Sequence, residues 1–166
     1  MKVKKIGHVA LRVADAEKSK AFYCDILGFR VSEQDPDHGG VFMTLGDDFH
    51  TVDLFQAPNG VERPAAGQTG MAHMAFQVAD YADLKDVYCS LIDHGVTVSR
   101  AVDHVSQRSI YFSDPDGNGL EVYFEQPGAL KRWETVGRGD EDVPLQITKP
   151  GEPLPPWLHE TWPPVN

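Results

Sequence analysis

The sequence has few of the features that mark several large protein classes. Two cysteines among 166 residues, Cys24 and Cys89, are too few for a disulfide framework. It has no run of about eighteen apolar residues to span a membrane, and its first residues lack the apolar core of a signal peptide. Lys and Arg number 15 against 25 Asp and Glu, which argues against a nucleic-acid-binding face. We therefore expect a soluble, acidic, cytoplasmic protein.

A weak internal repeat is the first positive feature. GHVALRVAD begins at Gly7 and AHMAFQVAD begins at Ala72, an offset of 65 residues. The same offset relates further pairs of identical residues: His8 and His73, Asp15 and Asp80, Tyr23 and Tyr88, and Cys24 and Cys89. A register kept over so many positions indicates two similar structural units.

Each copy of the repeat predicts the same order of elements. An alternating strand is followed by an amphipathic helix and then by three short strands, which Gly/Asp clusters separate. These three strands are expected around Phe29–Glu33, Val41–Leu45 and His50–Phe55, and then around Thr97–Ala101, Ser109–Phe112 and Leu120–Glu125. The prediction is an α+β fold with two tandem βαβββ modules, about 3–58 and 70–127, in a domain of residues 1–127.

The periodicity fails after Pro127. Residues 128–166, here called the C-terminal arm, hold most of the prolines and all three tryptophans, Trp133, Trp157 and Trp162. Prolines favour an extended course, and tryptophans usually pack rather than stay in solvent. We expect the arm to lie over the domain or over a partner subunit.

Four residues with metal-binding side chains occupy positions related by the repeat. His8 and His73 open the first strand of each copy, and Asp53 and Glu121 lie in the last strands. A single histidine in such a place is more often a hydrogen-bonded structural residue, but its repetition favours a functional role. Carboxylates among apolar residues are costly unless they are paired or bind a cation. Two histidines with one or two carboxylates suit a divalent metal of intermediate hardness.

The paired modules resemble the vicinal oxygen chelate superfamily, which includes glyoxalase I, fosfomycin and bleomycin resistance proteins and type I extradiol dioxygenases. Residues 102–121, VDHVSQRSIYFSDPDGNGLE, resemble the extradiol ring-cleavage signature at His104, Tyr111, Asp114, Pro115, Gly117 and Glu121. The stretch FHTV at 49–52 is similar to the strand that carries the acid/base histidine of those enzymes. The resemblance implies a cupped mixed sheet around a metal site.

The function that the resemblance implies is ring cleavage of a catechol by an Fe(II)-dependent extradiol dioxygenase, in aromatic compound metabolism. Mn(II), Ni(II) and Zn(II) are the alternative metals. The expected partners are a small-molecule catechol and O2 and, as in many relatives of this size, further copies of the chain in a homo-oligomer such as a dimer. No nucleic acid or membrane is expected. The implied site consists of the metal ligands His8, His73 and Glu121 and the catalytic residues His50, Tyr111 and His104.

In this scheme His50 transfers protons, Tyr111 hydrogen-bonds the substrate and His104 orients it. Asp53 departs from the extradiol pattern, which has a small residue there, whereas glyoxalase I uses that position for a fourth ligand. Strand alternation would also put His50 and Asp53 on opposite faces unless a bulge intervenes. Two alternatives therefore stay open: a glyoxalase I-like lyase or isomerase with Asp53 as fourth ligand, and a small-molecule-binding resistance protein without metal.

Overall fold

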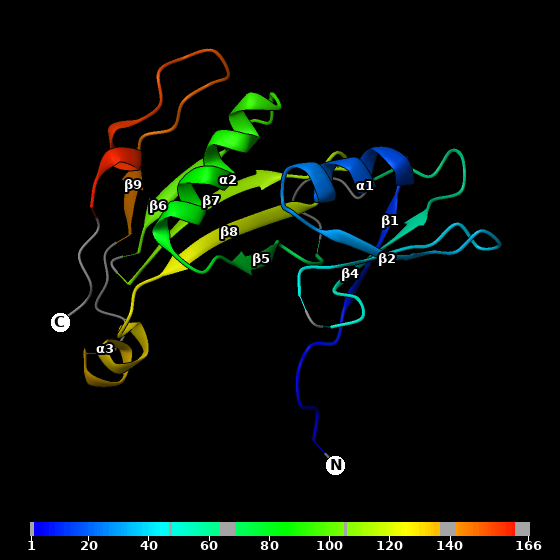
Figure 1. Cartoon of the computed structure of the whole chain (residues 1–166), viewed down its shortest axis with the longest axis horizontal. Coiled ribbons are helices and arrows are strands. Elements are labelled where there is room, and N and C mark those ends of the chain that lie inside the picture. The colour runs from blue at the N-terminus through cyan, green and yellow to red at the C-terminus, as the bar shows by residue number, and fades with distance from the viewer. Residues whose placement is uncertain (1, 47, 64–68, 105, 137–141, 162–166) are drawn as a thin grey trace. The chain divides into compact units, whose positions relative to one another are not determined.

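The computed structural model describes residues 2–46, 48–63, 69–104, 106–136 and 142–161. The chain divides into two compact units, Met1–Thr69 with Asp114–Asp116, and Gly70–Ser113 with Gly117–Asn166, called the first and second modules below (Figure 1). None of the helices within the described ranges is long and apolar enough to cross a bilayer.

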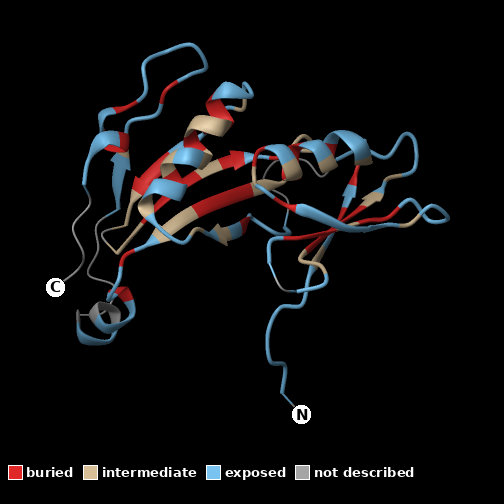
Figure 2. Ribbon diagram, in the orientation of Figure 1, coloured by how far each residue is buried: buried red, intermediate tan, exposed pale blue. Residues whose placement is uncertain are grey.

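The first module contains a four-stranded sheet and one helix. Its elements are β1 (Val9–Val13), α1 (Ala16–Asp25), β2 (Arg30–Gln34), β3 (Val41–Thr44) and β4 (Val52–Gln56). The strand order is β1-β4-β3-β2, with β1 parallel to β4 and the other pairs antiparallel. Alternate residues of β1, Leu11 and Val13, are buried, as the sequence pattern predicts. Figure 2 shows buried segments in the strands of each module. Helix α1 begins after Asp15, whose carboxylate accepts the Lys18 amide at 3.0 Å.

The turn after β7 belongs to the first module and anchors its helix. The buried Tyr23 hydroxyl donates to Asp114 Oδ2 at 3.0 Å, and the Ser19 hydroxyl donates to Asp116 Oδ2 at 3.0 Å. Burial raises the pKa of Tyr23 most, and the charge of Asp114 raises it further. The hydroxyl therefore keeps the proton that it donates. These two carboxylates therefore act as structural acceptors for α1.

The second module contains a five-stranded sheet and most of the helical residues. Its elements are β5 (Met74–Gln77), α2 (Tyr81–Asp93), β6 (Arg100–Asp103), β7 (Gln107–Ser113), β8 (Gly119–Glu125), α3 (Ala129–Val136), β9 (Val143–Leu145) and the 3-10 helix η1 (Pro156–His159). The strand order is β5-β8-β7-β6-β9, and only β5 and β8 run parallel. Helix α2 begins after Asp80 and buries Leu84, Tyr88 and Leu91. The predicted α+β fold of two βαβββ modules is confirmed.

The two parallel strand pairs repeat one register. In each pair the acidic residue of the last strand lies opposite an alanine, and the histidine precedes that alanine by two positions. The residues are His8, Ala10 and Asp53 in the first module and His73, Ala75 and Glu121 in the second. Each histidine stands one residue before its strand and contacts the carboxylate of its own module. The repeat therefore builds the same histidine–carboxylate arrangement twice.

The start of β4 differs from the expectation. The sequence pattern predicts a strand from His50, but β4 begins at Val52. The hydroxyl of Thr44 donates to the Asp48 carbonyl at 2.7 Å, which holds the preceding chain in a turn. The predicted alternation across His50 therefore does not apply, since His50 lies before the strand.

The C-terminal arm folds onto the second module. Its strand β9 pairs antiparallel with β6 at the edge of the sheet, and the described residues therefore hold nine strands instead of the eight expected. Trp157 is 3% exposed, and its ring meets the Tyr88 ring edge-on with centroids 5.4 Å apart. The sequence pattern predicts neither β9 nor α3. Trp162 and the side chain of Trp133 lie outside the described residues.

Replacing Gly119 by alanine is expected to destabilise the second module. A Cβ at Gly119 would lie 2.4 Å from the Ala72 carbonyl oxygen, closer than real Cβ atoms come to such an atom, and 3.3 Å from His73 Cβ, which is also tight. Such overpacking costs about 1–3 kcal/mol, so the urea midpoint should fall. Gly46→Ala is the matched control, since no atom lies within 4 Å of its added Cβ. Equal midpoints for both variants would contradict the prediction.

Candidate functional site

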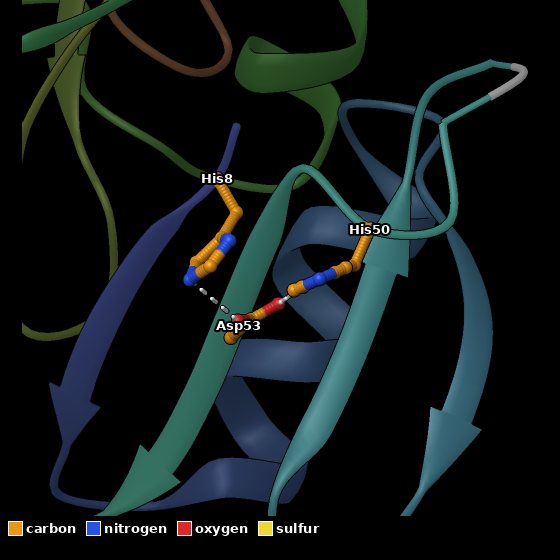
Figure 3. Close-up of side chains that lie close together, drawn as sticks. All are labelled: His8, His50 and Asp53. Carbon is orange, nitrogen blue, oxygen red and sulfur yellow. Dashed lines mark hydrogen bonds and ion pairs between the residues drawn. The ribbon is translucent and has the colours of Figure 1, made fainter. Parts of the chain in front are cut away.

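Two histidines of the first module converge on Asp53 of β4. His8 Nε2 lies 3.7 Å from Asp53 Oδ2, and His50 Nδ1 lies 2.6 Å from Asp53 Oδ1 (Figure 3). One donor atom from each residue can be chosen so that all three lie within 4.8 Å of one another. The arrangement brings two imidazoles and one carboxylate together, the donor types that hold divalent transition metals.

The Asp53 carboxylate is buried, with 2% of the residue exposed, and such a group requires compensation. His50 supplies it through the short contact to Asp53 Oδ1. The ring of His50 is held in turn by stacking on His8, with centroids 4.4 Å apart, and by the edges of Phe42 and Phe49. Packing on several sides fixes the direction in which this imidazole points.

The predicted separation of His50 and Asp53 on opposite strand faces is wrong. Both side chains meet without a bulge in β4, because His50 stands on the turn before the strand and not within it. A two-residue difference in where β4 begins accounts for the error. The sequence pattern placed the two residues near each other but could not show that they are partners.

Five residues of the second module form a continuous line of contacts. The sequence predicts four of them as site residues, and the fifth is Asp142. His73 Nε2 lies 2.9 Å from Glu121 Oε2, and the Tyr111 hydroxyl donates to Glu121 Oε1 at 3.0 Å. His104 Nε2 lies 3.3 Å from the Tyr111 hydroxyl oxygen. The other ring nitrogen, His104 Nδ1, lies 2.6 Å from Asp142 Oδ1 in the C-terminal arm. The network therefore joins the residue before β5, strands β7 and β8, the residue after β6, and the arm.

Tyr111 occupies the centre of this line. Burial raises the pKa of Tyr111 most, and the negative charge of Glu121 raises it further. The guanidinium of Arg100 lies over its ring, 4.1 Å from the centroid, and the His73 ring meets it edge-on. Tyr111 therefore keeps its hydroxyl proton at neutral pH and can donate it to a carboxylate or to a bound oxygen ligand.

The spacing of His73 and Glu121 fits a shared metal ion. Two metal–ligand bonds of about 2.1 Å at a right angle place the donor atoms about 3 Å apart. The distance between His73 Nε2 and Glu121 Oε2, 2.9 Å, is of that size. Glu121 is 5% exposed, so its carboxylate also needs the hydrogen bonds or the cation that such a site provides.

The remaining described histidines lie outside both groups. His38 Nδ1 contacts Asp35 Oδ2 at 2.8 Å in an exposed turn. His94 is the C-cap of α2, where its ring lies 2.8 Å from the Ser90 carbonyl oxygen, and His159 is exposed in η1. All three side chains are exposed at the surface or at a helix end.

The sequence profile of the Glyoxalase/Bleomycin resistance protein/Dioxygenase superfamily matches residues 5–122. The chain belongs to this superfamily. A solved member, a glyoxylase/bleomycin resistance protein/dioxygenase domain from Frankia sp. EAN1pec, superposes with a TM-score of 0.67 at 21% identity, over 76% of this chain and 96% of that domain. That likeness agrees with the fold.

Curated relatives of this chain include proteins named as dioxygenases. Catechol-2,3-dioxygenase from Bacillus subtilis (strain 168) is 32% identical over 135 residues, 81% of this chain and 46% of the relative. Biphenyl-2,3-diol 1,2-dioxygenase 2 from Rhodococcus globerulus is 33% identical over 121 residues, 73% of this chain and 63% of the relative. This chain thus spans less than two thirds of either enzyme. Because the superfamily also includes glyoxalases and resistance proteins, membership alone does not fix the reaction.

Proposed function

We propose that this chain is an Fe(II)-dependent extradiol dioxygenase that cleaves the ring of a catechol with O2. The observation that carries the proposal is the line of polar contacts from His73 through Glu121 and Tyr111 to His104. Lyase or isomerase chemistry of the glyoxalase type needs no tyrosine–histidine pair beside a metal ligand. The similarity to two ring-cleaving relatives supports the same conclusion.

The proposed ligands are His8, His73 and Glu121. Two imidazoles and one carboxylate are the ligand set of the facial triad in non-haem Fe(II) oxygenases. Fe(II) held by this set supplies open positions at which a catechol and O2 are brought together. The equal register of His8 and His73 in their strand pairs supports a common role for the two histidines.

His50 is the proposed general base and acid. A carboxylate only accepts hydrogen bonds, so the short contact to Asp53 Oδ1 assigns the ring proton to His50 Nδ1. Nε2 is then the nitrogen that can take a proton from a catechol hydroxyl and later return one. Asp53 acts in this scheme as the partner that orients His50.

The pair formed by Tyr111 and His104 is assigned to substrate positioning. The Tyr111 hydroxyl keeps its proton and donates it, which suits a hydrogen bond to a substrate oxygen. His104 Nε2 lies next to that hydroxyl and can direct a substituent of the ring. Both residues would hold substrate in the orientation that the reaction needs.

One observation favours a second candidate, a glyoxalase I-like lyase or isomerase with Ni(II) or Zn(II). Asp53 Oδ2 lies 3.7 Å from His8 Nε2, close enough for a modest movement to make Asp53 a fourth ligand. A fourth protein ligand would leave fewer positions for both a catechol and O2. The shorter contact of Asp53, 2.6 Å to His50, supports its role as the partner of His50 instead.

Oxygen uptake tests the proposed function directly. Protein loaded anaerobically with Fe(II) is mixed with a panel of catechols, DOPA included, and O2 consumption and visible absorbance are recorded. We expect uptake accompanied by a yellow ring-opened product. Hydroquinone is the matched control, since its para hydroxyls cannot chelate one metal. Full iron loading without uptake on any catechol would overturn the proposal and favour the four-ligand lyase.

A further inference from the structure

We propose that the C-terminal arm completes the site, with Asp142 as a positioning residue for His104. The carboxylate of Asp142 lies 2.6 Å from His104 Nδ1, on the side of the ring opposite to Tyr111. Asp142 lies outside residues 5–122, which the superfamily profile matches. The inference rests on the proposed function in one respect, which is the role of His104 in positioning substrate.

The backbone explains why Asp142 reaches His104. Strand β9 pairs antiparallel with β6, and Val143 lies opposite Asp103. In an antiparallel pair the next residues outward, Asp142 on one strand and His104 on the other, also face each other. The contact between these two side chains therefore follows from the strand register.

The arm is fastened at several points beyond β9, so the position of Asp142 does not depend on one short strand. The Thr148 amide donates to the buried Tyr88 hydroxyl of α2 at 2.9 Å, and within the arm Trp157 Nε1 donates to the Gln146 carbonyl at 2.8 Å. The Tyr81 hydroxyl donates to the Trp157 carbonyl at 2.9 Å. Polar anchors and the buried Trp157 ring together tie the arm to α2.

A further ion pair ties the end of the arm to the sheet. Arg108 on β7 is 7% exposed and donates to Asp103 at 2.8 Å and to Glu160 at 3.2 Å. A buried guanidinium requires such partners, because an uncompensated buried charge is strongly destabilising. The arm thereby supplies one of the carboxylates that compensate Arg108.

The contact with Asp142 fixes which nitrogen of His104 is available. Asp142 accepts only, so Nδ1 carries the hydrogen and Nε2 faces the Tyr111 hydroxyl. The side chain of His104 is 18% exposed and that of Asp142 is 51% exposed, so the partner approaches from the solvent side. Without Asp142 the ring is free to rotate and to exchange tautomers, and its alignment with Tyr111 is lost.

The test compares Asp142→Ala with Asp142→Asn and with Glu152→Ala. Asparagine keeps an oxygen that accepts from Nδ1, and Glu152 is a matched carboxylate on the arm whose contact is the Lys149 amide. In Fe(II)-loaded Asp142→Ala we expect kcat/KM for a catechol to fall roughly 10- to 100-fold, the range typical of partners that orient site histidines. Iron content should be unchanged, Asp142→Asn should recover part of the loss, and Glu152→Ala should match the wild type.

A second readout is independent of turnover. Nitrogen-15 NMR of the histidine rings should show the Nδ1–H tautomer of His104 in the wild type and its loss in Asp142→Ala, while tryptophan emission stays unchanged because the arm remains docked. If no catechol is consumed by the wild type, the NMR comparison still decides the Asp142–His104 link. An unaltered His104 signal, or a wild-type kcat/KM in Asp142→Ala, would overturn the inference.

Discussion

Glutamine in place of Glu121 is expected to strip Fe(II) from the protein and abolish catechol turnover. The amide has the size of the carboxylate and still accepts the hydrogen bond that Tyr111 donates to Oε1 at 3.0 Å. It carries no charge, however, and is a poor ligand for a divalent metal. Replacing a residue that only orients a metal ligand lowers metal affinity roughly 10- to 100-fold, and the loss of iron affinity here should be larger.

Glu125→Gln is the matched control for this substitution. Glu125 lies on the same strand, β8, four residues further along and on the same face, but it is exposed. Iron content after dialysis and O2 uptake are measured for both variants and the wild type. Wild-type iron content in Glu121→Gln would show that Glu121 is not a ligand.

Alanine in place of His50 is expected to lower kcat by about 10²- to 10⁴-fold, the usual contribution of a general acid or base. Iron content should be unchanged, because the proposed ligands do not include His50. The control is His38→Ala, which removes a histidine with the same three-residue spacing from its aspartate, Asp35, at a Nδ1–Oδ2 distance of 2.8 Å. Full turnover by His50→Ala would refute its role in proton transfer.

Asp53→Asn separates the two candidate functions. If Asp53 acts only as the partner of His50, its replacement should leave iron bound and lower kcat as His50→Ala does. As a fourth ligand, its replacement would release metal while His50→Ala does not. Measuring metal content in the two variants side by side therefore distinguishes a dioxygenase with an oriented base from a four-ligand lyase.

Most of the fold follows from local signals in the sequence. Asp15 and Asp80 act as N-caps of α1 and α2, as their position after an alternating strand predicts. Gly28 follows α1 with φ +75, a backbone conformation that favours glycine. The repeat then extends these signals from one module to the other, since both copies carry the same pattern.

The site was less predictable because two of its contacts depend on where strands begin and pair. A strand that starts at Val52 instead of His50 makes His50 and Asp53 partners, and strand boundaries are the weakest element of a sequence pattern. No sequence pattern marks Asp142 as a site residue. It lies 38 positions after His104, and β9 is a three-residue strand that contains a proline. Such a contact follows only from non-local pairing.

The anchoring of α1 gives Asp114, one position of the stretch 102–121 that resembles the ring-cleavage signature, a structural role. Asp114 and the neighbouring Asp116 accept from Tyr23 and Ser19, and this structural role does not depend on the reaction that the protein performs. His104 and Tyr111 instead contact each other and the carboxylates of Asp142 and Glu121. When other chains are compared with this one, identity at Asp114 alone therefore points to a shared scaffold, and the proposed chemistry is to be sought at His104 and Tyr111.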